Sequence, residues 1–265
     1  MSVSGRSIIA QQKLEKSLSR RGYYGAIVME YWRGARVSVA SNSISGVPAF
    51  VSGYENKADI YFDRARVDFV HRLPLDPTSA VLEVGCGTGA TGALALKRGR
   101  AGRYVGIELF ESAAARARNV LSEVVVGDVE AIEPDWQPAE FDALILSEVL
   151  EHLREPWAVL RKLSRFVRPG GLVLASSPNI SHWRVVRELV NGRFPLDDQG
   201  VFDRTHMRWF TPESFVEMFE GAGFAVDRVR PVTPFSPRTQ LFSALTRGRF
   251  DHLFMTQISI EGHKR

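Results

Sequence analysis

Short apolar runs alternate with helical stretches along the chain from residue 80 onward. The runs predict buried strands at residues 80–84, 104–107, 123–126, 141–147 and 172–176. Between them, apolar residues recur at helical spacing at 88–98, 111–119 and 156–166. Strands that alternate with helices form a parallel sheet with helices on both faces, and such sheets bind ligands at the carboxyl ends of their strands. The pattern therefore predicts an α/β, Rossmann-like fold.

The last part of the chain departs from this rhythm. Thr211-Pro212-Glu213 is typical of a helix start, because threonine caps a helix, proline fits its first turn and an acid follows. This last helix is expected to reach about Glu220. Further strands are expected at 224–229 and 253–260, separated by an excursion with a short helix at 231–251. Residues 178–211 then form an insertion before the last helix.

Residues 1–57 carry the least legible pattern. We interpret them as an N-terminal extension that acts as a lid or an oligomer contact, and 58–265 as the main domain. Residues 58–73 space their apolar side chains as a helix does, and Pro74 ends it.

Composition and charge narrow the class of protein. The chain has 265 residues, of which 45% are hydrophobic and 24% charged, as in ordinary globular proteins. The net charge is +4, but the arginines are scattered, so we expect no nucleic-acid partner. No apolar run reaches the roughly 18 residues of a membrane span, and the N-terminus lacks a secretory core. The single Cys86 allows no intrachain disulfide, which fits a cytoplasmic location.

A glycine-rich loop follows the first predicted strand. Gly85, Gly87 and Gly89 allow a sharp turn and a close approach of the backbone to a ligand, at the start of a helix whose N–H groups face that ligand. Gly85-x-Gly87-x-x-Ala90 also fits a permissive dinucleotide fingerprint. Cys86 sits within the loop, where we expect a small packing residue rather than a nucleophile.

Acidic residues lie within the first strand and at the ends of the next two. Glu108 can accept both hydroxyls of a ribose, or instead cap the next helix. Asp128 can accept from an adenine amino group while Val129 packs on the ring, or it can be a turn residue. Glu83, inside the first strand, needs a partner such as the loop N–H groups or the cationic end of a ligand.

Together these segments resemble class I S-adenosylmethionine-dependent methyltransferases, from about Tyr54 to the C-terminus. The matching pieces are Val81-Leu82-Glu83-Val84-Gly85-Cys86-Gly87-Thr88-Gly89, Gly106-Ile107-Glu108, Gly127-Asp128-Val129, Phe141-Asp142, Ser147-Glu148-Val149-Leu150-Glu151-His152-Leu153, Arg168-Pro169-Gly170-Gly171 and Ala222-Gly223-Phe224. The resemblance implies a seven-stranded sheet, mostly parallel with an antiparallel last strand. It assigns Glu108 to the ribose, Asp128 and Val129 to the adenine, and the glycine loop to the methionine part. We therefore predict an S-adenosylmethionine site made of Glu83, Gly85, Cys86, Gly87, Gly89, Glu108, Leu109, Asp128, Val129, Ser147 and Glu148.

A narrower resemblance concerns the acceptor. Three segments look like those of methyltransferases found beside bacterial glycosyltransferases: 177–182, 191–194 and 202–211. The residues before 50 match nothing in that group. The ubiquinone-pathway methyltransferases share the region of Glu151, His152 and Leu153 more loosely.

Histidines supply the candidate catalytic groups, because a hydroxyl acceptor needs a base within hydrogen-bond reach. His152 follows the fourth strand, His182 follows the fifth, and His206 lies in the insertion, where Asp203 is expected to orient it. Each has a structural alternative: a helix start, a loop residue and a turn network. Asp197 and Asp198 with Asp203 and His206 match no ligand spacing, so no metal site is predicted.

These observations predict an enzyme that methylates a hydroxyl of a sugar or glycosylated small molecule, with a homo-oligomer as the expected assembly. The alternative is an N- or C-methyltransferase that acts on a quinone, an amine or another metabolite. An NAD-dependent oxidoreductase and a non-catalytic cofactor-binding subunit are less favoured.

Overall fold

A computed structural model describes residues 65–265 of the chain. The predictions for the extension at 1–57 and for residues 58–64 lie outside the described residues. Of the helix expected at 58–73, the described part contains a single turn, α4 (Val67–Val70). His71 is its C-cap, and a turn follows.

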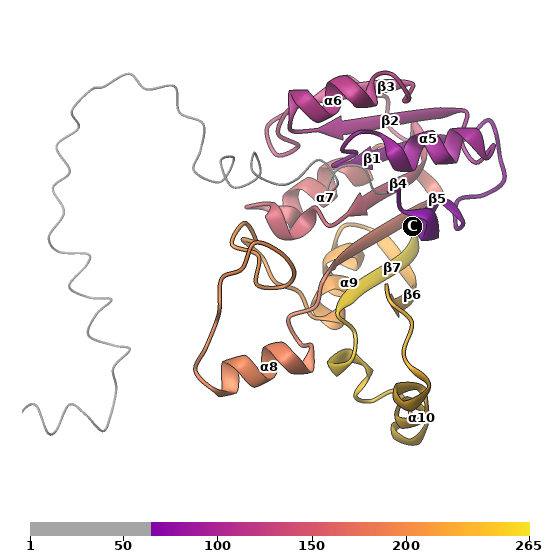
Figure 1. Cartoon of the computed structure of the whole chain (residues 1–265). Coiled ribbons are helices and arrows are strands. Elements are labelled where there is room, and N and C mark those ends of the chain that lie inside the picture. The colour runs from indigo at the N-terminus through magenta and orange to yellow at the C-terminus, as the bar shows by residue number, and fades with distance from the viewer. Residues whose placement is uncertain (1–64) are drawn as a thin grey trace, which may run out of the picture. The chain divides into compact units, whose positions relative to one another are not determined.

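One seven-stranded sheet forms the centre of the described region, with the order β3-β2-β1-β4-β5-β7-β6 (Figure 1). Strands β1 to β5 pair in parallel, and β7 pairs antiparallel with both β5 and β6. The bounds are β1 (Ala80–Val84), β2 (Arg103–Glu108), β3 (Glu123–Val126), β4 (Phe141–Ser147), β5 (Val167–Pro178), β6 (Phe224–Pro231) and β7 (Gln257–Lys264). The predicted mostly parallel sheet with an antiparallel last strand is confirmed.

Two hydrophobic cores cover the two faces of this sheet. Alternate side chains of a strand point to opposite faces, so Val81 and Leu82 of β1 enter different cores. One core contains residues of α4, α5 (Ala90–Lys97) and α6 (Glu111–Ala117). The other contains residues of α7 (Pro156–Ser164) and α9 (Pro212–Gly221). Helices on both faces were predicted and are confirmed.

Helix α9 begins where the sequence places it. The side chain of Thr211 accepts a hydrogen bond from the backbone N–H of Ser214, and the side chain of Ser214 accepts one from the backbone N–H of Thr211. Pro212 occupies the first turn. This capping box satisfies backbone donors at the helix start. The buried side chains Phe215, Met218 and Phe219 then hold the helix in the core.

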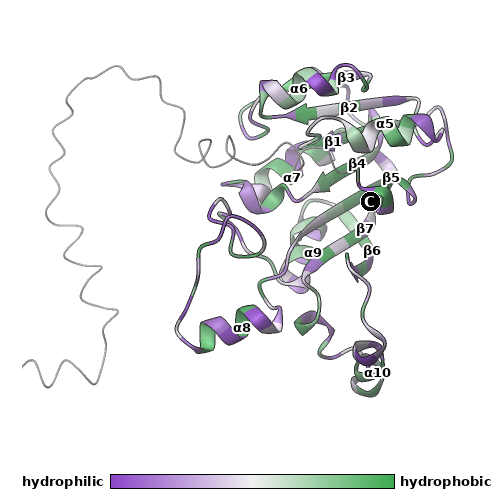
Figure 2. Cartoon of the chain, in the orientation of Figure 1, coloured by the Kyte–Doolittle hydropathy of each residue, from purple (hydrophilic) through white to green (hydrophobic). Residues whose placement is uncertain are grey.

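Two excursions leave the carboxyl edge of the sheet. The insertion after β5 contains α8 (Trp183–Val190), and the segment after β6 contains α10 (Pro237–Thr246) and the turn η3 (Asp251–Leu253). Because β5 and β6 both run antiparallel to β7, they are parallel to each other and end at the same edge. Figure 2 shows α8 with both hydrophilic and hydrophobic segments, in keeping with its exposed position.

Two expectations need correction. The strand expected at 253–260 begins only at Gln257. Phe254, which precedes the strand, packs against α10 instead of joining the sheet, because the centroid of its ring lies 5.5 Å from that of Phe242 in α10. The helix α8 inside the insertion was not predicted. No helix among residues 65–265 is long and apolar enough to cross a membrane.

Close packing of β6 against β7 yields a first prediction. A Cβ added to Gly262 would meet the carbonyl oxygen of Ala225 at 2.3 Å. Because that oxygen belongs to the backbone, Gly262→Ala is expected to lower the free energy of unfolding by about 1–3 kcal/mol in thermal or urea denaturation. The matched control is Gly221→Ala at the end of α9, where a Cβ meets nothing within 4 Å. Equal stability of the two variants would contradict the described pairing.

Candidate active site

The glycine loop joins β1 to α5 at the carboxyl edge of the sheet. Gly85, Gly87 and Gly89 have φ angles of +69°, +55° and +82°, a region that favours glycine. A Cβ on Gly85 would lie 2.7 Å from Cγ2 of Val149, so the loop is packed closely against the turn after β4. The N–H groups of Gly85 and Cys86 donate to the carbonyl of Ile107, which ties the loop to β2. The loop therefore consists of backbone without side chains at positions 85, 87 and 89, between β1 and α5.

Glu108 at the end of β2 is fixed by this loop. Its Oε2 accepts from the N–H of Gly87 at 2.8 Å, and its Oε1 accepts from the N–H of Phe110 at 3.0 Å. The side chain is buried, and burial raises its pKa while the backbone hydrogen bonds act in the opposite direction. The backbone of Leu109 contributes a third hydrogen bond. These backbone contacts fix the direction of the Glu108 carboxylate.

Glu83 lies beneath the loop. Its carboxyl accepts from the phenol of Tyr104 at 3.0 Å and contacts Thr91 at the start of α5. Burial raises the pKa of Glu83 to about 8, against the hydrogen bonds from these two side chains and the charge of Arg66. The contacts of Glu83 are therefore with side chains that support the loop.

The residues after β2 and β3 line the neighbouring edge. Oδ1 of Asp128 accepts from the N–H of Glu130 at 2.8 Å, as a turn aspartate does, and its Oδ2 lies 3.5 Å from Arg154. The carboxylate remains 41% exposed, so it is open to a ligand. Val129 is buried in the core, and Leu109 is half-buried beside Glu108.

Cys86 is a buried thiol. Burial raises its pKa, and the carboxyls of Glu83 and Glu108 add to the shift. Because a nucleophilic cysteine needs a lowered pKa, Cys86 fits the packing role expected from the sequence.

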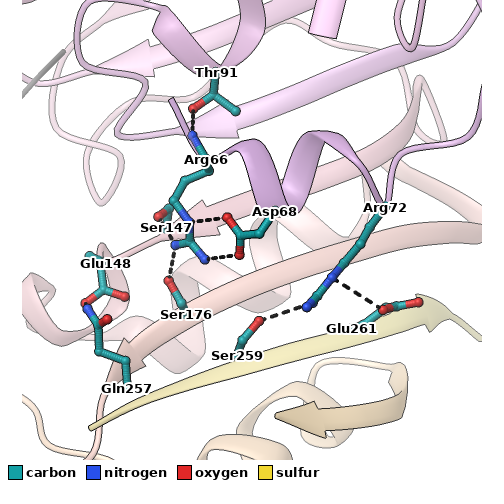
Figure 3. A network of polar contacts seen from close by, with 10 residues as sticks. All are labelled: Arg66, Asp68, Arg72, Thr91, Ser147, Glu148, Ser176, Gln257, Ser259 and Glu261. Atoms are coloured by element: carbon teal, nitrogen blue, oxygen red, sulfur yellow. Dashed lines mark hydrogen bonds and ion pairs between the residues drawn. The ribbon is translucent and has the colours of Figure 1, made fainter. Parts of the chain in front are cut away.

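Arg66 connects the segment before α4 with the ends of two central strands (Figure 3). Its Nη1 donates to the hydroxyls of Ser147 on β4 at 2.5 Å and Ser176 on β5 at 2.6 Å. Its other nitrogens donate to the carboxylate of Asp68, and its backbone N–H donates to Thr91. Sequence reasoning missed Arg66, because nothing in the pattern around it says that it folds over the sheet edge.

Glu148 directly follows β4 in a strained conformation. Its φ of +54° is unusual for a residue with a side chain. The strain is held by a hydrogen bond from its N–H to the carbonyl of Ser176 and by Gln257, whose Nε2 donates to Oε2 at 3.0 Å. Burial raises the pKa of Glu148, and it contacts Glu151. Strain of this kind is concentrated at functional sites.

The insertion brings His206 to His152. The two rings lie 4.7 Å apart between centroids, and both side chains are buried. Nδ1 of His152 lies 3.3 Å from both the carbonyl and the hydroxyl oxygens of Thr205, and that hydroxyl donates to Asp203 at 2.6 Å. Asp203 therefore acts on Thr205, which in turn positions His152. Thr205 was not foreseen from the sequence.

His182 has a different place. It is the N-cap of α8, where its Nδ1 accepts from the N–H of Arg184 at 3.4 Å. Burial and the charge of Arg184 lower its pKa. This capping contact gives His182 a structural role at the base of the insertion.

Comparison with known proteins decides the family. Residues 58–229 match the family model described as "Methyltransferase domain". The chain belongs to this methyltransferase family. It uses S-adenosylmethionine as its methyl donor.

Relatives of this methyltransferase differ in their acceptors. It is 35% identical over 184 residues to a ubiquinone biosynthesis O-methyltransferase of Pseudomonas aeruginosa, a match that covers 67% of this chain and 77% of the relative. It is 32% identical over 118 residues to a trans-aconitate 2-methyltransferase of Azoarcus sp., covering 43% and 45%. A solved S-adenosylmethionine-dependent methyltransferase of Mesorhizobium loti shares its fold with a TM-score of 0.54 and 16% identity, over 76% of this chain and 98% of that one.

The raised pKa of Glu83 predicts a pH-dependent stability. The folded methyltransferase keeps this proton to about pH 8, whereas an unfolded chain releases it near the ordinary value of 4.5. The folded state then binds more protons between these values, so the free energy of unfolding falls as the pH rises from about 4.5 to about 8. Its slope reaches at most about 1.4 kcal/mol per pH unit.

Glu83→Gln retains an acceptor for Tyr104 and removes the titration. Urea denaturation across this pH range is expected to give a flatter dependence for Glu83→Gln than for the wild type. Glu213→Gln, which alters an exposed carboxyl at the start of α9, is the control and should follow the wild type. A wild-type-like slope in Glu83→Gln would show that Glu83 is ionised in the fold.

Proposed function

We propose that this methyltransferase transfers the methyl group of S-adenosylmethionine to a hydroxyl group of a small molecule. The observation that carries the proposal is the buried group of Glu151, His152 and His206. Glu151 and His152 follow β4 at the edge that carries the glycine loop, and the insertion brings His206 to them. Methyl transfer to a neutral hydroxyl is slow unless its proton is removed or its oxygen is polarised. A group of imidazole and carboxylate side chains supplies both kinds of assistance.

The cofactor assignment follows from the order of the strand ends. Glu108 would accept the ribose hydroxyls, and Leu109, Asp128 and Val129 would line the adenine. The methionine part would lie along the glycine loop and the β4 end, at residues Glu83, Gly85, Cys86, Gly87, Gly89, Ser147 and Glu148. Arg66, at the ends of β4 and β5, has the charge to pair with the methionine carboxylate by displacing a serine contact. The protein's part is then to align an electrophile that the cofactor provides.

A sugar-bearing acceptor is the first class to test. The segments at 177–182, 191–194 and 202–211, which resemble methyltransferases found beside glycosyltransferases, form the base and the inner part of the insertion. A phenolic hydroxyl of a quinone precursor is the second class, favoured by the similarity to the Pseudomonas aeruginosa enzyme. We propose further that residues 1–57 act as a lid or an oligomer contact, that the chain forms a homo-oligomer, and that it acts in the cytoplasm.

Two measurements separate these functions. Thermal denaturation should show stabilisation by S-adenosylhomocysteine and none by NAD, because a ligand stabilises the state that binds it. Mass spectrometry with S-adenosylmethionine and a panel of sugars, quinol-type phenols and amines should show a methyl gain on a hydroxyl. Methyl gain on amines alone would overturn the proposal, and binding without turnover would favour a non-catalytic subunit.

Glu108→Ala tests the cofactor site. The variant should weaken S-adenosylhomocysteine binding by about 2–4 kcal/mol in calorimetry, because two hydrogen bonds to a charged group are lost. Glu108→Gln, which still offers an acceptor oxygen to the Gly87 N–H, should fall between this variant and the wild type. Glu111→Ala removes an exposed carboxylate that pairs with Arg118 and serves as the control with unchanged affinity. Unchanged affinity in a folded Glu108→Ala would remove Glu108 from the site.

A further inference from the structure

Glu151, His152 and His206 form a compact group of potential metal ligands. One ligand atom from each residue lies within 4.8 Å of the other two, and all three side chains are buried. Among residues 65–265, this is the one group of three or more such ligands that lie close enough together to hold a metal ion. Buried ionisable side chains are costly unless they are paired or bind a metal ion.

The backbone holds the three residues together. Glu151 and His152 lie on the short helix η2 (Leu150–His152) after β4, whereas His206 comes from the far end of the insertion. The N–H groups of Met207 and Arg208 both donate to the carbonyl of Glu151, at 2.8 and 3.0 Å. The approach of His206 to η2 is therefore fixed by the main chain, as a preorganised metal site requires.

The outer contacts of the imidazoles are those of metal-binding histidines. Nδ1 of His152 faces the carbonyl of Thr205 at 3.3 Å, and Nδ1 of His206 faces the carbonyl of Val201 at 3.4 Å. A histidine that binds a metal through one nitrogen commonly donates the other N–H to a backbone carbonyl. These contacts favour a proton on Nδ1 of each ring, which leaves the lone pair on Nε2.

The carboxylate is oriented in the same way. Oε2 of Glu151 accepts from the hydroxyl of Ser177 on β5 at 3.1 Å. Carboxylates that bind metals are themselves hydrogen-bonded by outer residues. Each of the three side chains thus has a separate contact that fixes its direction.

We propose that Glu151, His152 and His206 bind one divalent transition-metal ion of the zinc class. Two imidazoles and one carboxylate are donors that suit Zn²⁺, and three protein ligands leave a coordination position open. The ion joins the insertion to the turn after β4 and makes His152 and His206 ligands in place of bases. The sequence alone predicted no metal here, because the ligands lie on two separate segments and His206 was grouped with Asp203.

The role of the ion deepens the proposed function and, in that part, rests on it. Glu151 and His152 follow β4 at the sheet edge that carries the glycine loop, so an ion held there would offer its remaining coordination position to a hydroxyl oxygen of the acceptor. Coordination to a divalent ion lowers the pKa of a bound hydroxyl. The hydroxyl proton passes to water, the oxygen forms a bond to the methyl carbon, and the carbon–sulfur bond breaks with its electron pair on sulfur. Atoms and charge balance without a further reactant.

Metal binding is measured on the full chain, freed of any histidine tag and of metal by a chelator. Titration with Zn²⁺ and with Co²⁺ should give one equivalent bound, a higher melting temperature and a visible Co²⁺ spectrum typical of nitrogen and oxygen ligands. His206→Gln and Glu151→Gln should weaken binding by about tenfold or more. His263→Gln is the matched control, because His263 also contacts a carboxylate, Asp227 at 2.8 Å, but on exposed strands.

The outcomes separate the two proposals. No stoichiometric binding by the wild type, or binding unchanged in both His206→Gln and Glu151→Gln, would overturn the metal site. The Co²⁺ spectrum of the wild type tests the metal site even where a variant fails to fold. A spectrum without the signature of nitrogen ligands would contradict binding by His152 and His206. Metal bound with no hydroxyl methylation would leave the site standing and refute the function. Hydroxyl methylation by the metal-free chain at an undiminished rate would leave the function standing and refute the role of the ion in it.

Discussion

The hydrogen bond between the N–H of Gly87 and the carboxylate of Glu108 is the constraint on which the donor site depends. It joins the glycine loop after β1 to the end of β2. In the sheet, β1 lies between β2 and β4, so the strand order reverses its direction beside this loop. Parallel sheets open a crevice at such a point. Glu108 holds the loop in place and is itself held by the N–H of Phe110, so the loop and the carboxylate fix each other's position.

A continuous set of polar groups runs from the ends of β4 and β5 to the insertion. Arg66 contacts Ser176, Ser176 and Glu151 contact Glu148, and Glu151 lies beside His152 and His206. Burying so many ionisable groups works against stability unless each has a partner. The strained backbone of Glu148 adds a further cost at the same edge. The methyltransferase concentrates these unfavourable features at one edge of the sheet, where we propose that its ligands bind, while the two apolar cores on the faces of the sheet hold the fold.

Much of the fold could be predicted from the sequence, because it rests on local patterns. The apolar runs gave the strand positions, and Thr211 with Pro212 gave the start of α9. Gly87 and Glu108 were found for the same reason, since Gly87 lies in the loop that follows β1 and Glu108 ends β2. Contacts between distant segments carry no local signal. Three contacts depend on tertiary packing, so no sequence pattern predicted them. Arg66 donates to Ser147, His182 caps α8, and the ring of His152 lies beside that of His206.

The central claim is that S-adenosylmethionine binds along the glycine loop with its ribose on Glu108. A crystal structure of the full chain with S-adenosylhomocysteine tests this most directly. The account predicts ligand density against residues 85–89, with both ribose hydroxyls within hydrogen-bond distance of the Glu108 carboxylate and the sulfur toward the ends of β4 and β5. Density for the ligand at another edge of the sheet, or a ribose turned away from Glu108, would contradict it.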